Sequence, residues 1–322
     1  MRGRGPRLPA WPPAVTVEDD RAEPDAPSTG AAAEQSRTVL DKAARENFPV
    51  APFFLPRAVR GDLMAVYGYA RLVDDIGDGD LPPGRDDAIW LGLDGPTDDR
   101  TAVLDAFEKD LLRVFDGDPG HPLLKALRPT VERHRLGPEP FLELIEANRQ
   151  DQIVRRYRTY GELLDYCELS ANPVGHLVLG ISGVTSPERV RRSDAVCTAL
   201  QIVEHLQDVA EDLRQDRIYL PAEDMERFGV TEADLAGPTA NAAVRALVAF
   251  EAERAGDLLN EGSSLVGSVH GRLRLLLAGF VAGGRAALGA IAAVGHDVLS
   301  GPPKASKYGV LREMAATLRR ER

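Results

Sequence analysis

Cysteine is scarce in this sequence. Only two occur, Cys167 and Cys197, and each falls inside an apolar helical pattern. Two cysteines do not make the disulfide framework of a small secreted protein, and a reducing interior is the default for such a chain. We therefore expect no disulfide and two ordinary core residues.

Basic residues are also in deficit. The chain of 322 residues has 39 Lys and Arg against 50 Asp and Glu, a formal net charge of -11. A protein that binds nucleic acid by neutralising phosphates needs the opposite balance, so no nucleic-acid partner is expected. If the substrate is anionic, positive charge must come from outside the chain.

Long apolar runs are absent as well. The stretch "LRLLLAGFVAGG" from residue 273 is shorter than the roughly 20 apolar residues that cross a bilayer. Residues 1–37 hold six prolines and lack the apolar stretch of a signal peptide, so they are predicted to be a disordered tail. We expect a soluble protein, or one that only touches a membrane surface.

Helical periodicity is what the sequence has in abundance. From about residue 38, apolar residues recur at three- and four-residue spacing and β-branched alternation is scarce, which predicts an all-α fold. Pro and Gly gather at the breaks, for example in "GDGDLPPG", "SGVTSPE" and "SGPPK". We predict one helical domain over 38–300, followed by a basic tail or helix over 301–322 that includes Lys304 and Lys307.

An acidic cluster, "RLVDDIGD", ends the first long helical segment. One helix stripe carries Tyr67, Arg71, Asp74 and Asp78, and the opposite side carries Leu63, Val66, Ala70 and Val73. Residues four apart on a helix have Cβ atoms about 5–6 Å apart, so two such carboxylates can share a hard cation such as Mg²⁺. Taken alone, the cluster could equally be a solvated helix end.

A second acidic cluster lies in "ALQIVEHLQDVAEDLRQDRIYLP", residues 199–221. Its apolar stripe is Ile202, Leu206, Val209 and Leu213, and its polar side holds Gln201, Glu204, Asp208, Glu211 and Asp212. Arg214, Arg217 and Tyr219 follow within about two turns. Two carboxylate stripes that face each other could hold two or three Mg²⁺ ions, and these ions would bind a diphosphate. That would supply the missing positive charge.

The pair "RLVDDIGD" and "QDVAEDLRQDRIYLP" resembles the squalene/phytoene synthase family, the head-to-head prenyl diphosphate synthases. "ENFPVAPFFLP" at 46 and "YCELSANPVG" at 166 fall in the expected order, so the resemblance covers about 38–300. The sequences "ENFPVA", "LVDDIGD" and "YCELSANPVG" are most similar to those of the bacterial hydroxysqualene synthase branch of hopanoid synthesis. The resemblance implies an isoprenoid-synthase helical bundle with a central cavity, and conversion of presqualene diphosphate and water to hydroxysqualene and diphosphate.

The resemblance also implies roles for individual residues. The Mg²⁺ ligands would be Asp74, Asp78, Asp208 and Asp212. The diphosphate site would include Arg71, Gln201, Arg217 and Tyr219. Phe48 and Tyr166 match positions that border the prenyl chains or the reacting centre, although both could be ordinary core residues. Asn172 lies in the helix break "SANPVG", which is either a gap for a bulky ligand or a packing kink; Tyr166, Asn172 and the diphosphate itself are candidates for positioning water.

Some positions depart from the family pattern. Glu204 stands where many relatives have Asn, and "GGRAALGAI" offers only small residues and Arg285 where a tyrosine is usual. These departures affect the expected reaction more than the expected fold. The six histidines show no metal-ligand spacing and are interpreted as structural or surface residues: His121, His134, His176, His205, His270 and His296.

Several alternatives stay open. The same acids could serve condensation of two farnesyl diphosphates to presqualene diphosphate, squalene or phytoene, the chain could be a non-catalytic helical scaffold, and a terpene cyclase is a third option. NADPH is not expected, because no GxGxxG follows a strand. The expected location is cytoplasmic, with peripheral contact at the inner membrane face and neighbouring isoprenoid-pathway enzymes as partners left open. "LRLLLAGFVAGG" is either that membrane contact or a buried core helix.

Overall fold

The computed structural model describes residues 50–81, 87–93, 97 and 99–322. The predicted N-terminal tail and Phe48 lie outside these residues. The predicted domain limits at 38 and 300 stay predictions.

Helices make up nearly all regular structure in the described ranges. No β-strand is formed there; an isolated bridge joins Arg156 and Ile218. The all-α prediction is confirmed. In chain order the helices are α2 (Arg57–Asp78), α3 (Asp87–Trp90), α4 (Arg100–Asp116), α5 (Pro122–His134), α6 (Glu139–Ile153), α7 (Tyr160–Ser170), α8 (Asn172–Ile181), α9 (Pro187–Arg214), α10 (Ala222–Phe228), α11 (Glu232–Leu235), α12 (Ala242–Gly262), the 3-10 helix η1 (Ser263–Ser268), α13 (Gly271–Ala293) and α14 (Lys307–Arg320).

Helix ends fall where Pro, Gly and capping residues predict them. Helix α2 ends before Gly79, whose φ of 76° is the left-handed conformation that glycine adopts at low cost. Helix α9 begins at Pro187, and the Ser186 hydroxyl before it accepts from the Arg189 backbone N–H. The predicted break in "SANPVG" separates α7 from α8.

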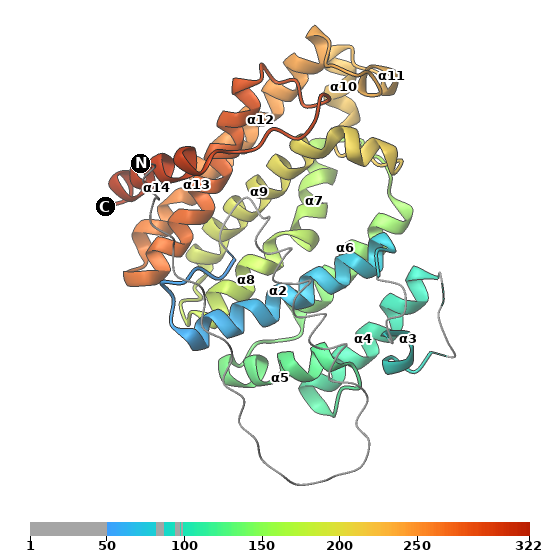
Figure 1. The fold of residues 1–322 in the computed structure, drawn as a ribbon, viewed down its shortest axis with the longest axis vertical. Helices are drawn as coiled ribbons and strands as arrows, with labels where there is room; N and C mark the ends of the chain where they lie inside the picture. Colours follow the sequence, from blue (N-terminus) through green and yellow to red (C-terminus); the bar gives the residue numbers. More distant parts are fainter. Residues whose placement is uncertain (1–49, 82–86, 94–96, 98) are drawn as a thin grey trace, which may run out of the picture.

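Helix α9 runs through the middle of the molecule (Figure 1). It packs against α7, α8, α12 and α13, while α2 packs against α4, α5, α6 and α8. Helix α14 lies along α13 at one side of the molecule (Figure 1). The two acidic segments therefore belong to two central helices, α2 and α9.

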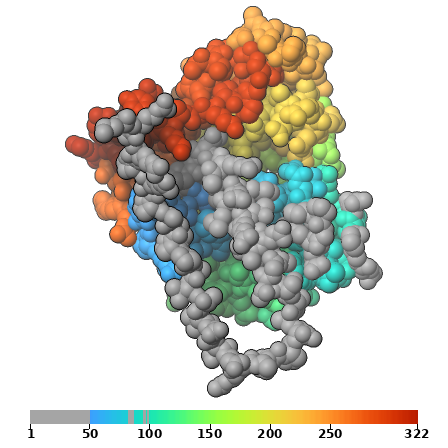
Figure 2. Space-filling view, in the orientation of Figure 1, coloured from blue at the N-terminus to red at the C-terminus, as the bar shows by residue number. Residues whose placement is uncertain are grey.

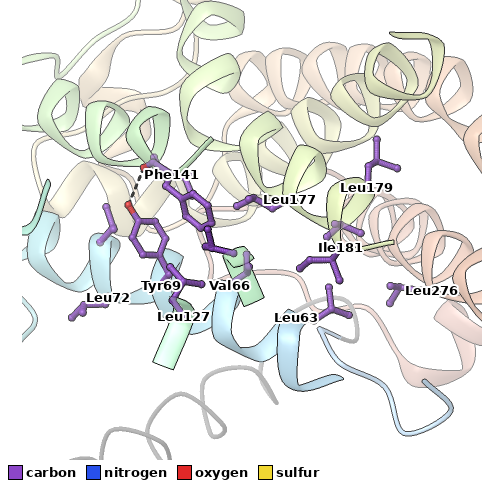
Figure 3. Close-up of a cluster of buried hydrophobic side chains, with 14 of the residues drawn as sticks. Leu63, Val66, Tyr69, Leu72, Leu127, Phe141, Leu177, Leu179, Ile181 and Leu276 are labelled. Atoms are coloured by element: carbon purple, nitrogen blue, oxygen red, sulfur yellow. Dashed lines mark hydrogen bonds between the residues drawn. The ribbon is translucent and has the colours of Figure 1, made fainter. Parts of the chain in front are cut away.

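The apolar side of α2 is buried as predicted. Leu63, Val66 and Val73 are each at most 4% exposed. Next to them, Tyr69 lies edge-on to Phe141 with ring centroids 5.0 Å apart, and its hydroxyl donates to the Phe141 carbonyl at 2.9 Å (Figure 3). This packing fixes the rotation of α2, so the opposite stripe faces a cavity.

Helix α13 contains the apolar stretch "LRLLLAGFVAGG", for which the sequence left two interpretations open, a membrane contact or a buried core helix. Its 23 residues are long and apolar enough to cross a membrane, but 61% of the most apolar window is buried inside the protein. Leu276, Ala278 and Val281 are at most 1% exposed. Here α13 is a core helix, and its apolar character is accounted for by internal packing.

Candidate active site

A polar cavity of about 220 Å³ lies between α2, α6, α7 and α9 and is bordered by the segment that follows α9. Nine of the residues predicted from the sequence line it: Arg71, Asp74, Asp78, Tyr166, Gln201, Asp208, Asp212, Arg217 and Tyr219. The other lining residues are Leu144, Asn148, Asp151, Ser170, Glu204 and His205. The two acidic motifs thus face one space.

One basic side chain connects the segment after α9 to the first acidic motif. Arg217 lies after α9 and its Nη1 donates to Asp78 Oδ1 of α2 at 2.8 Å, across 139 positions of sequence. The Arg217 guanidinium is only 10% exposed. Its Nε–H is buried without a hydrogen-bond partner. A buried unpaired guanidinium donor in a cavity is a group that an anionic ligand would satisfy.

Burial of the carboxylates disfavours their charged forms. Burial raises the pKa of Asp74 to about 6, against the lowering effect of the Asn148 hydrogen bond and of Arg71. Burial and the nearby charge of Asp208 raise the pKa of Asp212 to about 8. The carboxylates of the cavity are thus only partly compensated by protein cations.

Arg71 is oriented by a neighbour on its own helix. Its guanidinium pairs with Asp75 at 2.9 Å, and the Asp75 side chain is 6% exposed. Asp75 is therefore held beneath Arg71, which lines the cavity.

A buried carboxylate that the sequence prediction missed connects the two tyrosines. Tyr166 donates to Asp151 Oδ2 at 2.7 Å, and Tyr219 donates to Asp151 Oδ1 at 3.0 Å. Burial raises the pKa of Asp151, while the Tyr166 hydrogen bond and Arg217 oppose the rise. Asp151 fixes both phenol rings in the cavity wall.

His205 lies in the cavity wall too. Its ring stacks on Tyr219 with centroids 3.7 Å apart, and its Nε2 lies 3.2 Å from Gln201 Nε2. Burial lowers its pKa to about 3, so it is neutral at physiological pH. The sequence grouped His205 with structural or surface histidines, and its place in the cavity was not foreseen.

The remaining predicted positions lie elsewhere. Asn172 is buried outside the polar cavity, where its Oδ1 accepts from Thr198 at 3.0 Å. Arg285 lies in the segment where the family usually has a tyrosine. Its guanidinium donates hydrogen bonds to Thr317 of α14 and Asn260 of α12. Phe48 lies outside the described residues.

Asn148 and Asp151 had a weak signal in sequence. Both belong to the polar run "ANRQDQ" of α6, which is typical of an exposed helix face. Asn148 Nδ2 donates to Asp74 Oδ1 at 3.2 Å, so α6 supports the first acidic motif. Only the packing of α6 against α2 distinguishes this face from a solvated one.

The donor set fits Mg²⁺ that is shared with a ligand. Among the described residues, no three His, Cys, Asp or Glu side chains converge on one ion position. Mg²⁺ is usually held by one or two carboxylates together with phosphate oxygens and water, and it does not need a closed protein cage. Under-compensated acids on facing helices, next to an unpaired guanidinium N–H, fit that arrangement.

A second cavity, with an apolar lining, lies between α8, α9, η1 and α13. It is lined by Val174, Gly175, Val178, Leu179, Ser193, Val196, Cys197, Leu200, Leu265, Val266, Leu277, Phe280 and Val281. Gly175 permits the close approach of α8 to α9, since a Cβ there would lie 2.3 Å from Ser193 Oγ. Helix α9 contributes to both cavities, with its acids in one and its middle turns in the other.

An all-helical bundle with facing acidic motifs in a polar cavity, and an apolar cavity along the same helix, defines an isoprenoid-synthase fold. The family model described as squalene/phytoene synthase matches residues 41–309. The chain belongs to the squalene/phytoene synthase family.

The relatives within the family are named for different activities. A hydroxysqualene synthase of Zymomonas mobilis is 34% identical over 228 residues, 70% of this chain and 71% of that protein. A 15-cis-phytoene synthase of Synechococcus elongatus is 31% identical over 248 residues, 73% of this chain and 75% of that protein.

A solved structure supports the same assignment. The crystal structure of squalene synthase HpnC from Alicyclobacillus acidocaldarius is 40% identical, with a TM-score of 0.70 over 84% of this chain and 95% of that one. The family processes prenyl diphosphates and uses a divalent metal.

Proposed function

We propose that this protein converts presqualene diphosphate and water to hydroxysqualene and diphosphate, with two or three Mg²⁺ ions, in hopanoid synthesis. Support comes from the identity to hydroxysqualene synthases. It also comes from the pairing of a polar cavity, suited to a metal diphosphate, with an apolar cavity suited to prenyl chains.

Departure of diphosphate is the first chemical requirement. Mg²⁺ held by Asp74, Asp78, Asp208 and Asp212 would stabilise the negative charge that develops on the leaving group. Arg71 and Arg217 would bind that group directly, and the unpaired Nε–H of Arg217 is available for it. Because Asp78 already holds Arg217, this donor is positioned before the substrate arrives.

A carbocation remains after diphosphate departs. The ring of Tyr166, fixed by Asp151, can stabilise such a cation by about 0.5–2 kcal/mol. Water must then form the new C–O bond and lose a proton. Hydrogen-bonding groups in the cavity wall, with the released diphosphate as proton acceptor, would orient that water.

The observation that carries the proposal is the convergence of Asp74 and Asp208 on one cavity. The test incubates purified protein with Mg²⁺ and presqualene diphosphate, without NADPH, and identifies the product by mass. We expect hydroxysqualene from the wild type and at least a roughly 100-fold loss in Asp74→Ala and Asp208→Ala. Asp257→Ala, an exposed acid of α12, is the matched control and should behave as wild type.

Condensation of farnesyl diphosphate is the second candidate, because phytoene synthases match at 31–32% identity. The same assay with farnesyl diphosphate distinguishes the two. Presqualene diphosphate as product, or squalene once NADPH is added as the hydride donor, would replace the first proposal while keeping the roles of the acids. Mg²⁺-dependent diphosphate release from either substrate would refute the scaffold alternative, and the absence of turnover of both would favour it.

The proposed location is the cytoplasm, with peripheral contact at the inner membrane face. The proposed substrate and product are lipids, and only the diphosphate end is compatible with bulk water. Neighbouring isoprenoid-pathway enzymes would supply the one and consume the other.

A further inference from the structure

The outward face of α14 combines exposed apolar groups with positive charge. Tyr308 and Leu311 are 77% and 65% exposed, one turn apart. Lys307, Arg312 and Arg319 are also exposed on this helix. The inward face is apolar: Met314 and Leu318 pack against the core and Thr317 is fully buried.

The charge of this segment is opposite to that of the whole chain. Residues 304–322 hold six Lys and Arg and two Glu, in a protein whose formal net charge is -11. Glu313 pairs with Arg312 at 3.1 Å, so these two charges compensate each other and leave those of Lys307 and Arg319 on the outward face. Glu321 lies at the end of the helix and is turned toward η1, where it accepts from Ser263 at 2.7 Å. The outward face therefore remains positive.

This face is presented by a fixed helix. Arg285 of α13 donates to Thr317 Oγ1 at 2.9 Å. Arg274 of α13 donates to the carbonyls of Leu318 and Glu321 at 3.0 and 3.1 Å. With its carbonyls held by α13, the helix has a defined orientation, and the exposure of Tyr308 and Leu311 belongs to the folded protein. Figure 2 shows the C-terminal segment, in red, at the molecular surface.

We infer that the outward face of α14 docks the protein on a membrane that contains anionic phospholipid. Tyr308 and Leu311 would enter the headgroup region, and the surrounding cations would bind lipid phosphates. A polyanion such as nucleic acid would be attracted by the cations but would gain nothing from Leu311. The combination of both kinds of group on one face favours a lipid surface.

The docking itself is argued from the surface of α14 alone, and the reason why docking would be useful rests on the proposed function. Helix α13 supports α14 on one side and lines the apolar cavity with Leu277, Phe280 and Val281 on another. Docking through α14 would place that cavity one helix away from the bilayer, which is the source of a water-insoluble substrate and the destination of a product without charge.

The test is sedimentation of the full-length protein with vesicles of phosphatidylcholine alone, or with a third of the lipid replaced by phosphatidylglycerol. We expect at least tenfold stronger binding to the anionic vesicles, weakened by added salt. Tyr308→Ser/Leu311→Ser should lose about tenfold in binding. Lys307→Gln/Arg319→Gln should lose about 25-fold on anionic vesicles, at roughly fivefold per cation.

A matched control changes the same kinds of group elsewhere. Ile153→Ser/Arg113→Gln removes an 81% exposed aliphatic side chain and a 60% exposed arginine far from α14 in sequence, and it should bind as wild type. Wild-type protein that stays in solution with both vesicles, or α14 variants that bind like wild type, would overturn the inference. A concentration-dependent dimer that is lost in the α14 variants, without vesicle binding, would overturn it in favour of self-association.

The outcome is separable from that of the proposed function. Turnover of presqualene diphosphate in detergent micelles, without vesicles, should be the same in wild type and in the α14 variants. If the wild type produces no hydroxysqualene but binds anionic vesicles through α14, the proposed function fails and the docking face stands.

Discussion

Asp212 shows, at the scale of one residue, what the polar cavity costs the fold. Its pKa is raised to about 8 by burial and by Asp208, whereas the ordinary value is 3.8. The unfolded chain ionises this group far more easily than the folded protein does. The contribution of Asp212 to stability is therefore greatest below pH 3.8 and is lost as the pH rises through 8.

Asp212→Asn should raise the thermal stability of the Mg²⁺-free protein at pH 8 by on the order of 1 kcal/mol, or a few degrees in Tm. The gain should shrink toward pH 4, because the wild-type carboxyl is then protonated in the folded state. Added Mg²⁺ should stabilise the wild type more than the variant. Differential scanning calorimetry measures all three effects.

Glu211→Gln, at the exposed neighbouring acid, is the control and should change Tm little. A Mg²⁺-free Asp212→Asn protein that melts below wild type at pH 8 would contradict the argument.

The four motif acids could be placed from sequence because helix spacing puts the acids of each motif on one side of a helix, and the resemblance to the family selected these four among them. Asn148, Asp151 and His205 could not be placed in this way. A polar residue that faces a cavity and one that faces water have the same spacing along a helix. Which of the two occurs depends on the neighbouring helix, and that contact is formed only in the folded protein.

Helices α2 and α6 approach each other closely at Gly77. A Cβ at Gly77 would lie 2.0 Å from Asn148 Oδ1, and Asn148 is the residue that donates to Asp74. The glycine is therefore required by contact between two elements. Gly61 lies in the same helix, and a Cβ at that position would have no neighbouring atom within 4 Å.

Gly77→Ala should displace Asn148, lower the free energy of unfolding by about 1–3 kcal/mol and reduce turnover. Gly61→Ala should raise the free energy of unfolding by about 0.5–1 kcal/mol, because alanine is the better helix former, and leave turnover unchanged. Urea unfolding measures both. Equal effects at the two positions would mean that the α2–α6 contact does not depend on Gly77.

Helix ends were predictable because Pro, Gly and capping side chains act through their own backbone. The break at Gly79 and the start of α9 at Pro187 are examples. The rotation and neighbours of each helix were less predictable. The long apolar pattern of α13 did not show whether lipid or protein covers it, and the structure shows protein over most of its surface.

At the scale of the whole molecule, the buried apolar side chains of the described residues form two clusters. Phe107 and Leu104 belong to one, and Leu206 and Leu247 to the other. Partly buried residues such as Leu258 pack against both clusters. Because α9 and α13 also contribute to both, we expect the two to unfold together.

Leu104→Ala and Leu206→Ala should each lower the free energy of unfolding by about 2–5 kcal/mol. Each side chain is at most 1% exposed, and the two lie in different clusters. Both variants should keep one transition, coincident by near- and far-ultraviolet circular dichroism in urea. Two separate transitions, each sensitive to only one substitution, would divide the molecule into two folding units.

At this scale the fold and family followed from the order of several motifs along the chain, and both are confirmed. The reaction did not follow in the same way. The acids proposed to bind a metal diphosphate would serve either of the two candidate reactions, whereas the product would depend on cavity shape and access of water. Cavity shape and water access depend on many side chains together, and the spacing of these residues along the sequence does not indicate the product.

Helix α9 has one further consequence. Asp208 lies in the polar cavity, and Leu200, Val196 and Ser193 follow one another along the same helix in the wall of the apolar cavity. At 1.5 Å per residue, the 15 positions from Asp208 to Ser193 extend about 22 Å. If a prenyl diphosphate binds with its charged end at Asp208, as proposed, its chain would extend along this face of α9, and the bulk of the side chains there would limit the length of isoprenoid that fits.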